Sequence, residues 1–148
     1  MSVPKSERTE SIFEPVYRAG ILYNAVVAMC IKMPKRYTYL ILKDTVELSG
    51  EVLDYAKMAN SIFPTNQHEV QIRIDYWIKA RATLQALSGR IDRFHDVLES
   101  LSYVEQASGR RKGVTKNEIK AICDLIDTEQ KLLTKTIKNE RSRYSKLV

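Results

Sequence analysis

"KMPKRYTYLI", residues 32–41, decides the fold, because it places a proline and three cations between two long apolar stretches. Met33 precedes Pro34, and the residue before a proline disfavours the helical conformation. Pro34 itself suits the first turn of a helix. The stretch therefore predicts that one helix ends near Lys32 and that a second helix begins near Lys35.

Apolar residues recur at intervals of three and four on both sides of this hinge, which is the period of an amphipathic helix. Upstream, Pro15 opens a predicted helix that runs to about Lys32. Downstream, a helix is expected from Lys35 to Phe63, with two apolar stripes that make its buried arc wide. The first stripe holds Leu40, Ile41, Thr45, Leu48, Val52, Tyr55, Ala56, Ala59 and Phe63, and the second holds Tyr39, Leu42, Val46 and Leu53.

A third helix is predicted farther along the chain. Asn66 is a favoured N-cap residue, and an apolar face at helical spacing continues from it to Leu101 or Tyr103. This helix and the second one are long, at about 1.5 Å per residue. A loop is expected at 107–113.

The fourth helix begins at "TKNE" (115–118), which has the pattern of a capping box, and it ends near Tyr144. No segment shows a sustained alternation of apolar and polar residues bounded by turn residues, so no strand is predicted. We therefore predict an all-α fold, an up-down-up-down four-helix bundle with long central helices.

The 148 residues, of which 44% are hydrophobic and 28% charged, are typical of one globular domain. We expect residues 1–148 to form that domain, with a frayed segment at 1–12 and a basic loop at 107–113. The longest apolar run, "AGILYNAVVAMCI" (19–31), is shorter than a membrane-spanning helix. The acidic stretch before it does not resemble a signal peptide. A cytoplasmic protein without a membrane partner is therefore expected.

No catalytic motif is recognised. The chain contains no glycine-rich phosphate loop, no GxSxG and no HExxH. His68 and His95 are its only histidines, and Cys30 and Cys123 share no short spacing, which argues against a zinc site. We interpret both cysteines as buried and reduced, with a disulfide as the alternative. We expect no enzyme activity, no cofactor and no metal; a carboxylate metal site is the weakest hypothesis retained.

The net charge of +6 is unevenly placed. Residues 110–148 hold eleven Lys/Arg and five Asp/Glu, and so carry the whole excess. Such an asymmetry indicates a polyanionic partner, although a solvated helix face is the alternative. Within this region three lysines share one helical stripe, which further cations extend. The stripe consists of Lys131, Lys135 and Lys138, extended by Arg141, Arg143 and Lys146.

Rows of cations on long helices neutralise phosphates of a nucleic acid backbone without base selectivity. Tyr37 and Tyr39 could stack on bases, or they cover the end of the core. The predicted nucleic-acid-binding residues are Lys35, Arg36 and Tyr37 in the hinge, Arg73, Lys79, Arg81, Arg90 and Arg93 in the third helix, Arg110, Arg111 and Lys112 in the loop, and Lys131, Lys135 and Lys138 in the fourth helix.

The hinge resembles that of the accessory variability determinants of diversity-generating retroelements, which are four-helix-bundle proteins. Proteins encoded in intervening sequences of ribosomal RNA genes share this bundle. The family's hinge has an aromatic residue or methionine, then Pro-Lys, a basic or polar residue, an aromatic residue and an apolar helix. Met33, Pro34, Lys35, Arg36 and Tyr37 fit this pattern.

The resemblance extends over about residues 16–137. "ARATLQALSGRIDRFHDVL" (80–98) is similar to the family's third helix, and "VTKNEIKAICDLIDTEQKLLTKTI" (114–137) falls in register with its fourth. Family members often close the fourth helix with a Gly-Gly-Trp-like segment, whereas residues 133–144 here continue as a charged helix.

The resemblance implies a non-enzymatic accessory protein that forms a basic homopentamer and binds RNA or DNA together with a reverse transcriptase. The reverse transcriptase supplies the chemistry of template-directed mutagenic complementary-DNA synthesis. The cations of the hinge and the third helix would then contribute to the basic surface. The alternative function is a structural or protein-interaction bundle that binds no nucleic acid.

Overall fold

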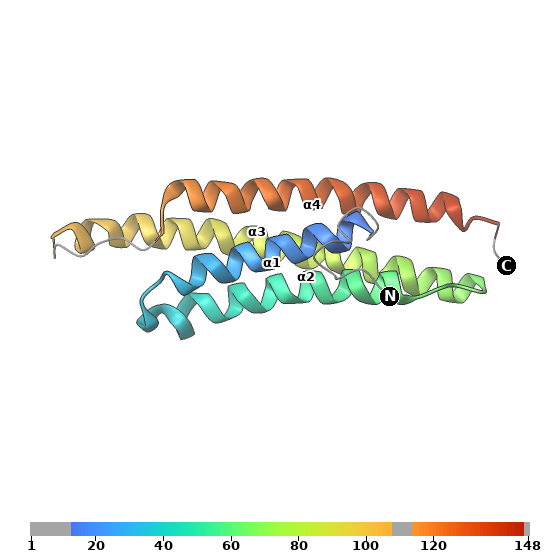
Figure 1. Cartoon of the computed structure of the whole chain (residues 1–148), viewed down its shortest axis with the longest axis horizontal. Helices are drawn as coiled ribbons and strands as arrows, with labels where there is room; N and C mark the ends of the chain where they lie inside the picture. Colours follow the sequence, from blue (N-terminus) through green and yellow to red (C-terminus); the bar gives the residue numbers. More distant parts are fainter. Residues whose placement is uncertain (1–12, 108–113, 147–148) are drawn as a thin grey trace, which may run out of the picture.

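Four helices run side by side along one long axis (Figure 1). A computed structural model describes residues 13–107 and 114–146, with residues 101–107 described by their backbone alone. Within these residues there is no strand, and the predicted all-α four-helix bundle is confirmed. The helices are α1 (Glu14–Ile31), α2 (Lys43–Ser61), α3 (Gln67–Ala107) and α4 (Lys116–Arg143).

Each helix runs back along the one before it, so the up-down-up-down order is also observed (Figure 1). α2 packs against α1 and α3, and α4 closes the bundle by packing against both α3 and α1. The helices differ greatly in length. α3 has 41 residues and is about 60 Å long, whereas α1 has 18 residues and is about 27 Å long.

The core consists of apolar side chains contributed by all four helices. Trp77 and Phe94 of α3 are its largest fully buried members. Around them lie Leu22, Val26 and Met29 of α1, Val52, Ala56 and Ala59 of α2, Leu84, Leu87 and Ile91 of α3, and Ile122, Ile126, Leu133 and Ile137 of α4. Most of these residues lie on helix faces that their regular helical spacing predicted to be buried.

The hinge differs from the predicted start of the second helix. A 3-10 turn, η2 (Lys35–Tyr37), and a π turn, η3 (Thr38–Leu42), precede α2. A π turn holds more residues per turn than an α-helix, so Tyr39 and Leu40 within it do not continue the stripe that is buried along α2. Tyr39 is 87% exposed and Leu40 77% exposed, and the prediction that both lie on a buried face is wrong.

The predicted end of the second helix is also wrong. α2 ends at Ser61, and Ile62 has an extended backbone with φ −88° and ψ 121°. Phe63 therefore lies beyond the helix and is 83% exposed instead of belonging to the core face.

Side-chain capping at the start of α3 follows the prediction. The Oδ1 atom of Asn66 accepts a hydrogen bond from the Glu69 backbone N–H at 2.9 Å, and its Nδ2 donates to Glu69 Oε1 at 3.1 Å. The backbone N–H of Thr65 donates to the same Oε1 at 2.9 Å, and the Thr65 hydroxyl also contacts it. The hydrogen bonds from Thr65 lower the pKa of the Glu69 carboxyl.

The predicted N-cap of α4 is present, but the Glu118 carboxylate, which a capping box would direct to the Thr115 backbone, pairs with Lys32 instead. Thr115 Oγ1 accepts a hydrogen bond from the Glu118 backbone N–H at 3.2 Å. The Glu118 carboxylate forms an ion pair with Lys32 Nζ at 3.0 Å. This ion pair links the start of α4 to the end of α1.

Gly89 lies inside α3, where a glycine costs conformational entropy relative to alanine. A Cβ atom at this position would have no neighbouring heavy atom within 4 Å. We therefore expect Gly89→Ala to raise the free energy of unfolding by about 0.5–1 kcal/mol, measured by urea denaturation. A lower free energy in the variant would contradict the open surroundings of this residue.

Candidate nucleic-acid interface

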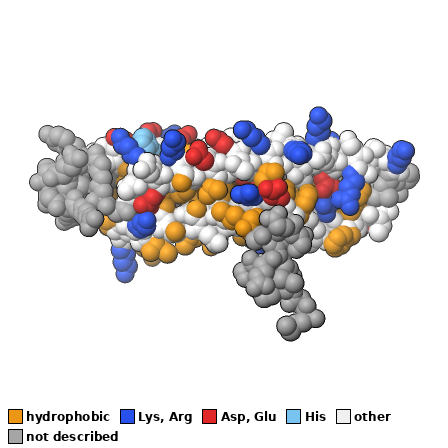
Figure 2. Space-filling model, turned by 45° about the horizontal axis from the view of Figure 1, so that its top comes forward, with side chains coloured by type: hydrophobic (Ala, Val, Ile, Leu, Met, Phe, Trp, Pro, Cys, Tyr) orange, Lys and Arg blue, Asp and Glu red, His pale blue; other side chains and the backbone are white. Residues whose placement is uncertain are grey.

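The second half of α4 and the residues just after it form a strongly basic surface. Six cations occur between residues 130 and 146, and all six are exposed. They are Lys131, Lys135, Lys138, Arg141, Arg143 and Lys146. Figure 2 brings α4 toward the viewer and shows blue side chains spread over the half of the molecule that holds the C-terminal end of this helix. We call these six residues the α4 basic row.

The one acidic residue of this stretch, Glu140, faces inward. It is 3% exposed, and its carboxylate forms a bidentate ion pair with Arg73 of α3. Arg73 Nη2 lies 2.8 Å from Glu140 Oε1, and Arg73 Nε lies 3.1 Å from Oε2. The exposed charge between residues 130 and 146 is consequently all positive.

Arg73 is buried, and the prediction that it contributes to an exposed basic surface is wrong. Arg73 is 4% exposed. Its Nε and Nη2 donate to Glu140, and its Nη1 donates to two backbone carbonyls. These are the carbonyl oxygens of Ala59 at 3.0 Å and Ile62 at 2.7 Å, at the end of α2. Arg73 therefore joins α2, α3 and α4 from the inside. Its position three residues after Val70 and four before Trp77, on the apolar face of α3, was the sequence signal for burial.

Tyr37 also lies inside, and its ring is not exposed for stacking on bases. It is 8% exposed and belongs to the apolar core, in agreement with the alternative that it covers the end of the bundle. The Arg36 guanidinium lies 4.8 Å from the centre of its ring, and Arg36 Nη2 donates to its hydroxyl at 3.3 Å. Tyr39, two residues on, is the exposed aromatic residue of the hinge.

Arg90 and Arg93 are exposed and lie near the hinge. They line a groove of about 650 Å³ together with Leu40 and Ile41 of η3. The fold thus gathers the predicted cations of the hinge and of this part of α3 at one end of the bundle.

The remaining α3 candidates are more dispersed. Lys79 is exposed, and its Nζ lies 5.2 Å from the centre of the Tyr76 ring, which stacks on Tyr55 of α2. Lys79 is therefore on the α2 side of α3. Arg81 is half-buried. The predicted loop cations Arg110, Arg111 and Lys112 lie outside the described residues.

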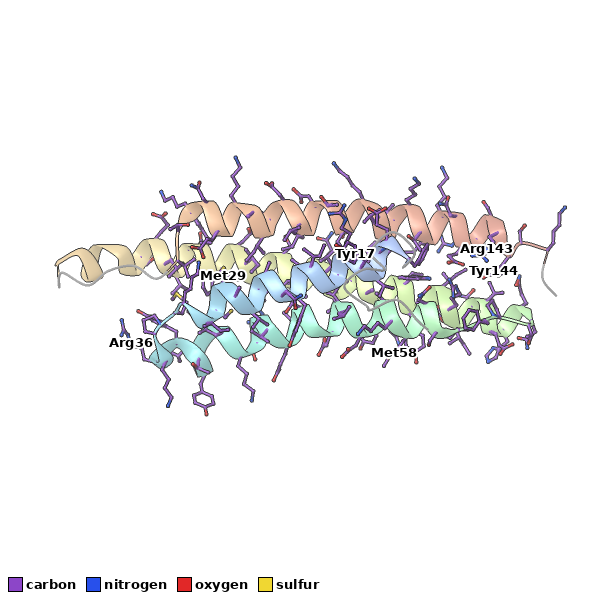
Figure 3. All side chains as sticks on the ribbon, in the orientation of Figure 1. Tyr17, Met29, Arg36, Met58, Arg143 and Tyr144 are labelled. Carbon is purple, nitrogen blue, oxygen red and sulfur yellow. The ribbon has the colours of Figure 1, made fainter. Side chains whose placement is uncertain are left out.

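The candidates therefore form two separate groups. Arg36 in the hinge and Arg143 near the end of α4 lie at opposite ends of the bundle (Figure 3). Lys135 and Arg143 border a groove of about 320 Å³ between α4 and the start of α1, where Glu14 is also present. Five cations of the α4 basic row lie on α4 itself, where Arg143 borders the groove beside α1 and Arg141 borders a groove beside α3, whereas the hinge cations lie near exposed apolar side chains.

A second buried carboxyl on α4 is that of Glu129. Its side chain is fully buried, and neither of its oxygens has a hydrogen-bond partner among the residues that the structure describes. Burial raises the pKa of Glu129 to about 8, although the Arg18 charge opposes this shift. Sequence reasoning missed this residue, because glutamate is usually exposed. Its spacing from Ile126 and Leu133 on the apolar stripe was the available signal.

Both cysteines are free thiols, so the alternative of a disulfide is not observed. Cys30 is buried as predicted, and burial raises the pKa of its thiol to about 11. Cys123 is only half-buried, and burial together with nearby aspartates raises its pKa. Neither thiol is activated for nucleophilic chemistry, which needs the thiolate.

His95 lies 3.5 Å from Glu99 and 3.8 Å from Asp96, measured from its ring nitrogens to their carboxylates. His68 is exposed. Across residues 13–107 and 114–146, no group of three or more His, Cys, Asp or Glu side chains is placed to hold a metal ion. In the same residues, no helix carries an apolar stretch long enough to span a bilayer.

Comparison of the chain with protein-family models, with curated proteins and with solved structures gives no match.

Proposed function

We propose that this protein is a non-enzymatic accessory protein that binds nucleic acid through the α4 basic row and acts with a reverse transcriptase in template-directed mutagenic complementary-DNA synthesis. The observation that supports nucleic acid binding is the inward position of Glu140, which leaves residues 130–146 without an exposed carboxylate of their own. Phosphates of RNA or DNA are the complementary ligand, and the contacts are with the backbone.

The reverse transcriptase and a homopentameric assembly enter the proposal through the resemblance of the hinge, "MPKRY" (33–37), to the retroelement accessory proteins. Exposed apolar side chains at the hinge support an assembly of some kind, because burying them in a contact is favourable. They also favour the second candidate function, a protein-interaction bundle whose basic row is only solvated.

Charge reversal on the α4 basic row tests nucleic acid binding. We expect Lys131→Glu combined with Lys135→Glu to weaken binding to a structured RNA and to a duplex DNA. For duplex DNA, the slope of log affinity against log salt should fall by about 2, since two phosphate contacts are lost. The measurement is fluorescence anisotropy at several salt concentrations.

Lys57→Glu combined with Lys120→Glu is the matched control, because it changes the net charge equally at exposed positions outside the row. Equal losses in the two variants would show that only net charge matters. No binding by the unaltered protein at low salt would leave the protein-interaction bundle as the function.

The partner and the assembly need separate measurements. Light scattering of a homopentamer should give five times the chain mass of 17.1 kDa. Complementary-DNA synthesis by a retroelement reverse transcriptase on its RNA template should depend on added accessory protein. Synthesis that is unchanged by the protein would remove the reverse transcriptase from the proposal.

A further inference from the structure

A groove of about 530 Å³ lies between the end of α1 and the turn that leads into α2. Its lining is mainly apolar and also contains three charged residues. The apolar lining includes Val27, Ile31, Met33, Leu42 and Val46, and the charged lining consists of Lys35, Lys43 and Glu47. We call this the hinge groove.

A large apolar side chain is exposed in the groove itself. Ile31, which lines it, is 76% exposed. Fully burying such a side chain is worth about 1.5–3 kcal/mol. Tyr39 and Leu40 of the adjoining π turn are also exposed, at 87% and 77%, and Leu40 lines the separate groove beside Arg90 and Arg93.

The π turn shapes one wall of the groove. Its backbone directs Leu42, which lines the groove, into the core and leaves Tyr39 and Leu40 in solvent. Such turns are rare within helices and occur frequently at functional sites.

The charges around the groove indicate the sign of its ligand. Residues 31–43 contain four cations and no acidic residue. Lys32 is paired with Glu118, but Lys35 and Lys43 are exposed and pair with no carboxylate of the described residues. Glu47 is the single acidic residue of the lining. The groove therefore combines an apolar interior with a mainly positive edge.

We propose that the hinge groove binds an amphipathic helix of a protein partner, whose apolar side chains enter the groove while its acidic residues lie beside Lys35 and Lys43. A helix presents apolar side chains at positions i, i+3 or i+4 and i+7, and grooves of this type accept them. A nucleic acid fits less well, because its phosphates could contact Lys35 and Lys43 but would leave the apolar lining unburied.

This inference takes from the proposed function only the existence of a protein partner. It concerns a surface other than the α4 basic row. The two can fail separately, because the display experiment below contains no nucleic acid.

Display of a library of amphipathic peptides about 20 residues long, selected on the full-length protein, tests the proposal. We expect enriched peptides to carry apolar residues at helical spacing and Asp or Glu beside them. By fluorescence anisotropy, Ile31→Glu should weaken the best peptide about tenfold or more, and so should Lys35→Glu with Lys43→Glu. Phe63→Glu, an equally exposed apolar position outside the groove, should leave binding unchanged.

Three results would overturn the proposal. The first is that selection on the unaltered protein enriches no peptides beyond those enriched by selection on the Ile31→Glu protein. The second is enrichment of basic peptides, or of peptides without helical spacing. The third is a fall in particle mass by light scattering in the Ile31→Glu variant alone, which would make the groove a contact between copies of this chain. Circular dichroism of both groove variants and of Phe63→Glu establishes that all three are folded.

Discussion

Replacing Arg73 by methionine is expected to lower the free energy of unfolding by about 3–5 kcal/mol, because it leaves the buried Glu140 carboxylate without its ion-pair partner. The substitution also removes the donor to the carbonyls of Ala59 and Ile62. Both groups of the ion pair are nearly fully buried, so water cannot replace the lost contacts. Urea denaturation followed by circular dichroism, at a fixed protein concentration, measures the effect.

The double variant Arg73→Met with Glu140→Leu is the control that isolates the ion pair. It removes the orphaned carboxylate along with the arginine, and buried ion pairs replaced by apolar side chains are often neutral. We expect it to be more stable than Arg73→Met alone. A double variant that loses as much as the two single variants together would show that Arg73 and Glu140 act independently.

Glu129 is expected to make the bundle less stable as the pH rises. In the unfolded chain its carboxyl loses a proton near pH 4.5, whereas in the folded chain burial raises its pKa to about 8. Between these values the folded state binds one more proton than the unfolded state. Raising the pH in this window therefore lowers the free energy of unfolding, by about 1 kcal/mol per pH unit and by several kcal/mol in total.

Denaturation of the unaltered protein and of Glu129→Leu from pH 5 to pH 9 checks this prediction. Leucine removes both the titration and the unpartnered oxygens, so the variant should be more stable at pH 8 and lack this contribution to the pH dependence. Glu129→Gln should also lack the contribution but be less stable than the leucine variant. The same decline with pH in all three proteins would contradict the role of Glu129.

The architecture could be predicted because it depends on periodicity. Pro34 separates two amphipathic segments, and Asn66 and Thr115 mark helix starts through hydrogen bonds that their side chains make locally. The π turn could not be predicted in the same way. Leu40 and Leu42 were each assigned to an apolar stripe of one continuous helix, and the π turn of η3 interrupts that helix, so Leu42 is buried whereas Leu40 is exposed.

The candidate site was predictable in part. Lys131, Lys135 and Lys138 share a stripe because their spacing fits a helix, and all three are exposed. Arg73 was assigned to the surface by residue type, since arginine is usually exposed. Its burial depends on Glu140, a residue 67 positions away that only the packing of α3 against α4 brings into reach.

The Arg73–Glu140 ion pair has a consequence for how this sequence can change over evolutionary time. Losing either residue alone destabilises the bundle, and an unpaired Glu140 that turned outward would interrupt the α4 basic row. The two positions are therefore expected to covary in related sequences, either as a charged pair or as two apolar residues. In lineages with the apolar pair, no buried carboxylate would remain that could turn outward among the cations of α4.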